Sequence, residues 1–327
     1  MSSSISSSRR AIRIYAAAVA ASLAIAAGAT EALLRTQVAP QDNFARHLAL
    51  LRTTDARDAA FGDSHVARGF AAEAPMVNLA YPSETIERFA WKAKAYFARL
   101  TPGRVIVQAD PHLFTPYRLA DGLGDYPERI AKAPGAARLL ILADHHRDRI
   151  PAYWRAFLVS GGRLASSIEF SERGTLLSGG DLSAVPGRKR AYDARARVAL
   201  HRPIAQFRDT GEARAYESLL DFLFERGAEI CLVTFPLSPD YRATLAEDRE
   251  AEAFRTWLDL IAYFREQAER VKARYVDASA AVADAGLYRD VDHLNRTGAL
   301  AYSPRLMEDC FGTAAEERTV RRARAKR

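Results

Sequence analysis

The sequence has only two cysteines, Cys231 and Cys310, so at most one disulfide can form within the chain. Cys231 lies in the apolar run "EICLVTFPL", which predicts a buried strand, and Cys310 follows a late helical segment. A residue in a strand core seldom faces a terminal helix with the geometry that a disulfide needs. We therefore expect the two thiols to stay unpaired, even in an oxidising compartment.

No internal repeat, nucleic-acid-binding motif or second membrane anchor is visible in the sequence. The formal net charge of +7 comes largely from arginines near the N-terminus and from the tail "RTVRRARAKR". These segments are typical of an export signal and a solvated chain end, so we expect no nucleic-acid partner. About half of the residues are apolar, which excludes a disordered chain and supplies the core of one large α/β domain.

We also expect no cofactor and no metal. The adjacent pair His145 and His146 lacks the i, i+4 spacing of a helical metal site and has no evident cysteine or glutamate partner. This pair therefore predicts a solvated face.

An apolar segment near the N-terminus is short for a membrane span. In "RRAIRIYAAAVAASLAIAAGA", three arginines precede a charge-free run from Ile14 to Ala29, below the roughly 18 to 20 residues of a secure span. Ala32 to Leu34 can lengthen it. The small residues around Gly28 fit a signal-peptide cleavage site, but we favour an uncleaved anchor. Either way, the arginines stay in the cytoplasm and the rest of the chain is expected to be periplasmic or extracytoplasmic.

Five apolar runs alternate with helical patterns in the remaining sequence. The expected strands are "DAAFGDS", "PMVNLAY", "RVIVQAD", "AEICLVTFPL" and "ARYVDAS". Segments such as "ETIERFAWKAKAYFARL" between them have apolar residues spaced three and four apart, which is typical of helices. This alternation predicts an α/β fold with a parallel sheet covered on both faces.

A long interval between the third and fourth strands lacks this alternation. Residues 113–203 contain helical pieces and a Gly-rich loop or small hairpin with its turn near Arg173 and Gly174, and we expect an insertion that covers or shapes a site. The predicted divisions are an anchor or signal peptide (1–36), a helical stalk (37–55), the α/β domain with its insertion (56–312) and a basic flexible tail (313–327).

Polar clusters follow four of the five predicted strands, where ligands bind in open parallel sheets. The first strand ends in "GDSH", which contains Ser64 and His65, and the segment "DVDH" follows the fifth. A serine needs a base to remove its proton, and an imidazole needs a carboxylate to orient it. His293 and Asp290 can supply these roles, whereas the rival Asp292 is adjacent to His293 and is expected to point away. His65 is expected to shape the turn or to contact a substrate.

The order and spacing of "FGDSH", "VNLAYPSET" and "DVDH" resemble the SGNH (GDSL-type) hydrolase superfamily over about residues 55–312. The resemblance implies a flavodoxin-like, three-layer α/β/α sandwich with five parallel strands. The strand order that we expect is 2-1-3-4-5. By this resemblance Ser64 is the nucleophile, His293 the base and Asp290 the residue that orients the base.

The resemblance also implies an oxyanion hole, built in this family from the serine amide, a glycine amide after strand two and an asparagine after strand three. The corresponding donors here are Ser64, then Ser83 or Ala80, then Asp110. An ionised Asp110 would repel an oxyanion. Three alternatives therefore stay open: Asp110 is protonated, His112 donates instead, or the third donor is missing.

The anchored arrangement resembles SGNH proteins that move acetyl groups on envelope polysaccharides, and its residue order is closer to that of the peptidoglycan O-acetyltransferases. The resemblance implies O-acetyl transfer to or from an envelope or exported polysaccharide through an acyl-serine, with a membrane-bound O-acyltransferase as a partner. The alternatives are an esterase of carbohydrates or lipids and a catalytically silent SGNH-like scaffold of a polysaccharide assembly system.

Overall fold

The structure is a computed structural model that describes residues 3–131, 140, 148–164, 168–247 and 252–312. The pair His145 and His146 and the basic tail lie outside these residues. The chain divides into two compact units. The first comprises residues 1–45 and 132–166, and the second residues 46–131 and 167–327.

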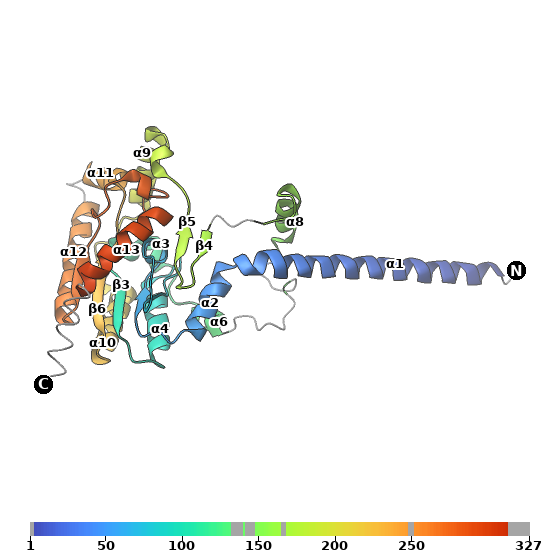
Figure 1. Cartoon of the computed structure of the whole chain (residues 1–327), viewed down its shortest axis with the longest axis horizontal. Coiled ribbons are helices and arrows are strands. Elements are labelled where there is room, and N and C mark those ends of the chain that lie inside the picture. The colour runs from blue at the N-terminus through green and yellow to red at the C-terminus, as the bar shows by residue number, and fades with distance from the viewer. Residues whose placement is uncertain (1–2, 132–139, 141–147, 165–167, 248–251, 313–327) are drawn as a thin grey trace. The chain divides into compact units, whose positions relative to one another are not determined.

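A long helix dominates the first unit (Figure 1). Helix α1, Ser3–Leu33, continues through short helical turns to Gln41 and is long and apolar enough to cross a membrane. Its side chains are exposed from residue 10 to residue 29, and Thr30, Leu33 and Leu34 are the first that are buried. The elements of this unit besides α1 are η1 (Leu34–Val38), η2 (Ala39–Gln41) and α8 (Ile150–Val159), and α2 (Asn43–Thr53) leads into the second unit.

A parallel sheet of five strands forms the centre of the second unit (Figure 1). The strands are β1 (Ala59–Phe61), β2 (Val77–Asn78), β3 (Arg104–Gln108), β6 (Glu229–Thr234) and β7 (Arg274–Asp277). They lie in the order β2-β1-β3-β6-β7, and every neighbouring pair is parallel. The predicted α/β class, the five parallel strands and their order are therefore confirmed.

Alternate residues of the strands point to opposite faces of this sheet, and both faces are covered. On one face, Ala60 and Ile106 belong to a core that includes residues of α3 and α13. On the other, the Phe61 ring lies 5.7 Å from the Phe97 ring of α4. The helices along the sheet are α3 (Ser64–Gly69), α4 (Ile86–Phe97), α10 (Gly211–Glu225), α12 (Glu252–Arg270) and α13 (Arg296–Phe311).

The interval between β3 and β6 contains short helices and a hairpin of two antiparallel strands, β4 (Ile168–Phe170) and β5 (Leu176–Ser178). This hairpin has the turn predicted near Arg173 and Gly174. Part of the predicted insertion, residues 132–166, groups with α1 in the first unit. The remaining elements of the second unit are η3 (Pro111–Phe114), α5 (Pro116–Leu119), α6 (Tyr126–Ala131), η5 (Leu182–Ala184), α9 (Gly187–Leu200), η6 (Phe207–Asp209), α11 (Pro239–Glu247) and η7 (Ala285–Leu287).

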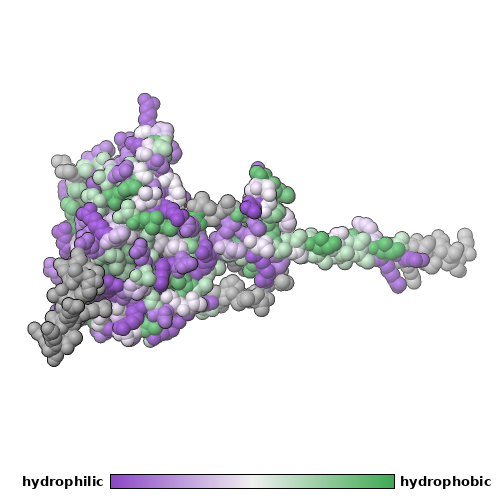
Figure 2. All heavy atoms as spheres, viewed as in Figure 1, coloured by the Kyte–Doolittle hydropathy of each residue, from purple (hydrophilic) through white to green (hydrophobic). Residues whose placement is uncertain are grey.

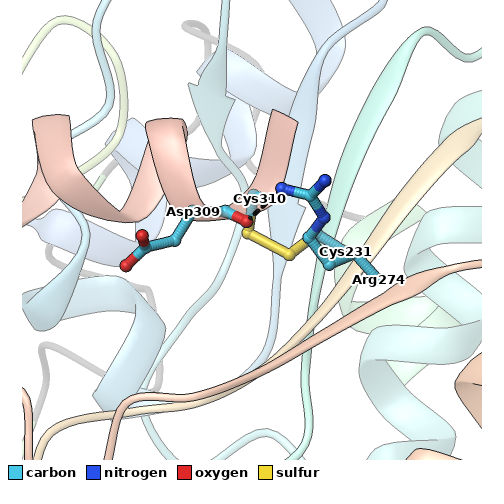
Figure 3. Close-up of a disulfide and its surroundings, with 4 residues drawn as sticks. All are labelled: Cys231, Arg274, Asp309 and Cys310. Carbon is cyan, nitrogen blue, oxygen red and sulfur yellow. Dashed lines mark hydrogen bonds between the residues drawn. A yellow bond between two sulfur atoms is a disulfide. The ribbon is translucent and has the colours of Figure 1, made fainter. Parts of the chain in front are cut away.

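A disulfide joins Cys231 to Cys310, so the expectation that these thiols stay unpaired is wrong (Figure 3). Cys231 lies in β6 and Cys310 in the last turn of α13, with their Cα atoms 5.5 Å apart. The pairing is possible because α13 packs on the sheet and so brings its last turn to β6. Beside the bond, Arg274 Nη1 donates to the carbonyl oxygen of Asp309 at 2.7 Å.

Reducing this disulfide is expected to destabilise the protein substantially. The bond closes a loop with a sequence separation of 79 residues. Opening this loop increases the entropy of the unfolded chain, which lowers the free energy of unfolding by roughly 4 kcal/mol. We expect the urea midpoint of the full-length protein to fall after reduction. The Cys231→Ala/Cys310→Ala variant is the control, because reductant should leave its midpoint unchanged. An unchanged wild-type midpoint after both thiols have been titrated would contradict the prediction.

Candidate active site

The turn after β1 is fixed by Gln108 at the end of β3. Gly62 has a φ of 156°, and a Cβ atom there would lie 2.4 Å from Gln108 Oε1. The same Oε1 accepts a hydrogen bond from the Asp63 amide at 2.6 Å, and Gln108 Nε2 donates to Asp63 Oδ1 at 2.9 Å. Glycine is therefore needed at position 62 because the side chain of Gln108 occupies the space beside it.

Ser64 begins α3 directly after this turn. Asp63 caps the helix, since its Oδ1 accepts a hydrogen bond from the His65 amide at 2.9 Å. Asp63 is completely buried, whereas Ser64 is only half-buried. The cap thus holds Ser64 at the carboxyl end of the strand with its side chain partly open to solvent.

The predicted triad residues lie in hydrogen-bond contact. Ser64 Oγ lies 2.9 Å from His293 Nε2, and His293 Nδ1 lies 2.8 Å from Asp290 Oδ1. Asp290 Oδ1 also accepts from the backbone amide of His293 at 3.0 Å. A carboxylate bonded to Nδ1 places the proton there and leaves Nε2 free to accept the serine proton. This arrangement matches the geometry that a serine nucleophile requires.

Asp292 does not point away from His293 as the sequence suggested. Its Oδ1 lies 3.4 Å from His293 Nδ1, because the loop carrying both residues is tightly folded. However, that oxygen makes no hydrogen bond among the described residues. Asp290 is therefore the carboxylate that orients His293, and Asp292 acts on it through its charge alone.

A buried histidine with two carboxylate partners lies next to the triad. His65 lies between two carboxylates, with Nδ1 3.0 Å from Asp110 and Nε2 3.5 Å from Asp292. Burial alone would lower the pKa of His65, but Asp110, Asp292 and Asp63 outweigh it and raise the pKa to about 10. His65 is therefore a buried cation at neutral pH. Its side chain is buried and bonds Asp110 and Asp292 on the inner side of the site.

Asp63 has its own set of donors. His112 Nε2 bonds Asp63 Oδ2 at 2.9 Å, and Arg118 Nη2 donates to the same oxygen. Burial alone would raise the pKa of Asp63, but His112 and Arg118 hold it well below its usual value. Burial and the nearby His65 lower the pKa of His112, which therefore donates to Asp63 as a neutral ring.

The predicted insertion contributes residues to this cluster that sequence reasoning missed. Arg197 of α9 lies 3.3 Å from Asp292 Oδ1, and His201 lies 3.8 Å from Asp292 Oδ2. The His201 ring also stacks on His112, with centroids 4.7 Å apart. Neither Arg197 nor His201 belongs to a recognisable sequence motif, so the sequence offered no signal for them. Gln108 is different, because a glutamine inside the apolar run "RVIVQAD" is a signal that could have been noticed.

The hydrogen bonds of each candidate group show whether it can donate to an oxyanion. Ala80 is excluded because its amide donates to Asn78 Oδ1 at 3.1 Å. Asp110 is also excluded as a donor, since its carboxylate accepts from the Phe235 amide at 2.8 Å, from Gln108 and from His65. The proposals that Asp110 or His112 completes the hole are not supported, because both side chains bind buried partners instead.

Two backbone amides remain as donors. Within the described residues, the amides of Ser64 and Ser83 donate to no other group. Ser83 has a φ of 66°, a left-handed conformation that favours glycine, and its side chain is exposed. The position that the resemblance assigns to a glycine amide thus has glycine-like backbone geometry.

Two groups of side chains are close enough to contact one metal ion: His65 with Asp110 and His112, and His65 with Asp292 and His293. In the first group, His65 bonds Asp110 and His112 bonds Asp63. In the second, His293 is engaged by Ser64 and Asp290. Because these atoms already bond one another, the described geometry is that of a hydrogen-bonded charge network, and we assign no ion to it.

Compared with known proteins, the chain matches no family model and no curated sequence. A serine, an imidazole and a carboxylate that are hydrogen-bonded in series can form and resolve an acyl-serine when two backbone amides are available to bind the oxyanion.

The charge of His65 is expected to make stability depend on pH. Because its folded pKa of about 10 exceeds the unfolded value, His65 stabilises the fold fully below about pH 6.5, and this contribution is lost as the pH rises toward 10. His65→Gln should cost about 3–5 kcal/mol near pH 6, because it leaves two buried carboxylates without their cation. The cost should shrink by pH 10.

Urea unfolding of both proteins at several pH values measures this difference, since urea does not screen charges. His47→Gln is the matched control, because burial and the nearby Lys92 lower the pKa of that buried histidine well below its usual value. A penalty for His65→Gln that is the same at pH 6 and pH 10 would show that His65 is not charged.

Proposed function

We propose that this protein is a serine-dependent acyltransferase of the SGNH type. The observation that carries the proposal is the unbroken hydrogen-bonded chain from Ser64 through His293 to Asp290. The five-stranded parallel sheet with order β2-β1-β3-β6-β7 supports it, because that order is the one expected of the flavodoxin-like SGNH fold.

The proposed reaction has two halves. In the first, Ser64 Oγ attacks the carbonyl carbon of an acyl ester while His293 Nε2 takes the serine proton. The imidazolium is stabilised by Asp290, and the negative oxygen of the tetrahedral intermediate accepts from the amides of Ser64 and Ser83. His293 then gives the proton to the departing alcohol. In the second half, His293 removes a proton from an incoming hydroxyl, which attacks the acyl-serine, and His293 returns that proton to Ser64 Oγ as the ester bond to Ser64 breaks.

An envelope glycan is the proposed acceptor. Helix α1 is long and apolar enough to hold the protein at a membrane, and the arginines before its apolar run favour a cytoplasmic N-terminus. The second unit is then extracytoplasmic. The Cys231–Cys310 disulfide supports this placement, since disulfides persist in oxidising compartments. From the resemblance to SGNH proteins that move acetyl groups on envelope polysaccharides, the proposed acyl group is acetyl and the proposed partner is a membrane-bound O-acyltransferase.

A serine-directed fluorophosphonate probe tests the nucleophile. We expect full-length protein in detergent to be labelled and Ser64→Ala not to be labelled. Asp290→Asn should slow labelling by about 10³–10⁴-fold, because the amide favours the wrong imidazole tautomer. Ser83→Gly is the matched control, since it keeps the amide and suits the local φ. Absence of labelling in folded wild type would leave only the catalytically silent scaffold.

The direction of transfer is tested by the fate of the acyl group. Full-length protein is incubated with an acetyl ester donor, with and without envelope oligosaccharides, and both free acetate and acetylated sugar are followed by mass spectrometry. We expect acetylated sugar to form and acetate release to fall when the acceptor is present, because both acceptors compete for one acyl-enzyme. Acetate release that no acceptor changes, together with deacetylation of an acetylated glycan, would establish an esterase instead.

A further inference from the structure

Helix α8 in the first unit is almost entirely apolar and buries none of its residues. Its sequence is "IPAYWRAFLV", in which Arg155 is the single charged residue. Leu158 is 71% exposed and Val159 is 82% exposed. A helix that is apolar on most of its surface is expected in a protein core or a membrane. With ten residues and about 15 Å of length, it is too short to cross a bilayer.

Helix α8 contacts α1 at the point where the exposed part of α1 ends. Trp154 Nε1 donates to Thr30 Oγ1 at 3.2 Å, and Thr30 is the first buried residue after the exposed stretch of α1. The chain after α8 returns to the same end, where the Leu164 amide donates to Gln37 Oε1 at 3.4 Å. Figure 1 shows α8 beside this end of α1 and directed away from the helix axis.

The length of the apolar run sets the depth of this contact in a bilayer. Ile14 to Ala29 is sixteen residues, which rise about 24 Å along a helix, whereas the hydrocarbon layer is about 30 Å thick. If Arg13 marks one edge of the layer, the layer reaches beyond Ala29 into the turn where Trp154 docks. The charge of Glu31, which lies just beyond Thr30, is compensated. Glu31 pairs with Arg35 at 2.7 Å and accepts a hydrogen bond from the Leu140 amide at 3.0 Å.

The side chains of α8 suit the boundary between lipid and water. Trp154 and Tyr153 are residue types that concentrate at membrane interfaces. Arg149 and Arg155 are exposed and long enough to extend toward phosphates while their stems lie on apolar surface. Figure 2 shows hydrophobic residues along the exposed part of α1 and on the small helical lobe beside it.

We propose that α8 is an interfacial helix that lies in the lipid headgroup region beside α1, with Leu158 and Val159 inserted among the acyl chains. The occupant of its apolar surface is the bilayer that α1 spans. This continuity with α1 favours lipid over a second copy of the chain. The helix would thereby give the protein a second membrane contact and restrain α1 at a fixed depth.

Tryptophan quenching by brominated lipid tests the proposal on the full chain in phosphatidylcholine vesicles. The Trp91→Phe/Trp257→Phe variant keeps only Trp154. We expect it to lose about half of its emission when the lipid carries bromine near the headgroup, because interfacial helices lie about 5–10 Å deep. The matched control keeps only Trp257, which is 6% exposed and covered by protein, and it should lose almost none.

A spin label at Val159→Cys gives an independent measurement, with Leu258→Cys on α12 as an exposed apolar control in the second unit. We expect the Val159 label to be accessible to oxygen and protected from a water-soluble nickel complex. Accessibility to nickel would place α8 in water, and protection from both reagents would show that protein covers it. Either of these results, or an unquenched Trp154, would overturn the proposal. None depends on Ser64 chemistry.

Discussion

The buried carboxylate of Asp63 is the constraint on which the serine turn depends. It accepts hydrogen bonds from the His65 amide, Gln108, His112 and Arg118, which belong to α3, β3, η3 and α5. An unpaired carboxylate in the interior would cost several kcal/mol, so the fold is stable only when these donors are all in place. The adjacent Ser64 begins the helix that Asp63 caps, so these bonds also fix the backbone from which Ser64 faces His293.

A second layer of buried charge links the turn to the loop that carries His293. His65 joins Asp110 at the end of β3 to Asp292, and Arg197 and His201 from the insertion approach the same Asp292. Burial alone would raise the pKa of Asp292, but His293, His65 and His201 hold it well below its usual range. The insertion is therefore part of the site and preorganises the loop that carries His293. Helix α13 begins just after that loop and is tied to β6 by the disulfide.

Several features of the fold and site could be predicted because they depend on local patterns. Apolar runs separated by helical spacing indicated the five strands, and parallel strands necessarily bring their carboxyl ends to one edge. The same reasoning predicts that Ser64, Asp290 and His293 lie together at this edge, and the structure has them in hydrogen-bond contact. The disulfide could not be predicted, because the residues near Cys231 do not indicate which part of β6 the end of α13 contacts.

The sequence by itself determined the parallel sheet, the edge that carries the polar residues and the three residue types needed for acyl transfer, because each follows from spacing along the chain. Only the tertiary structure decided that Asp292 also lies close to His293, that Asp110 accepts hydrogen bonds instead of donating them, and that His65 is a buried cation. The surroundings of Asp110 and His65 depend on how β3, β6 and the loop that carries Asp292 pack together, and these segments are far apart in sequence. No single segment encodes this packing.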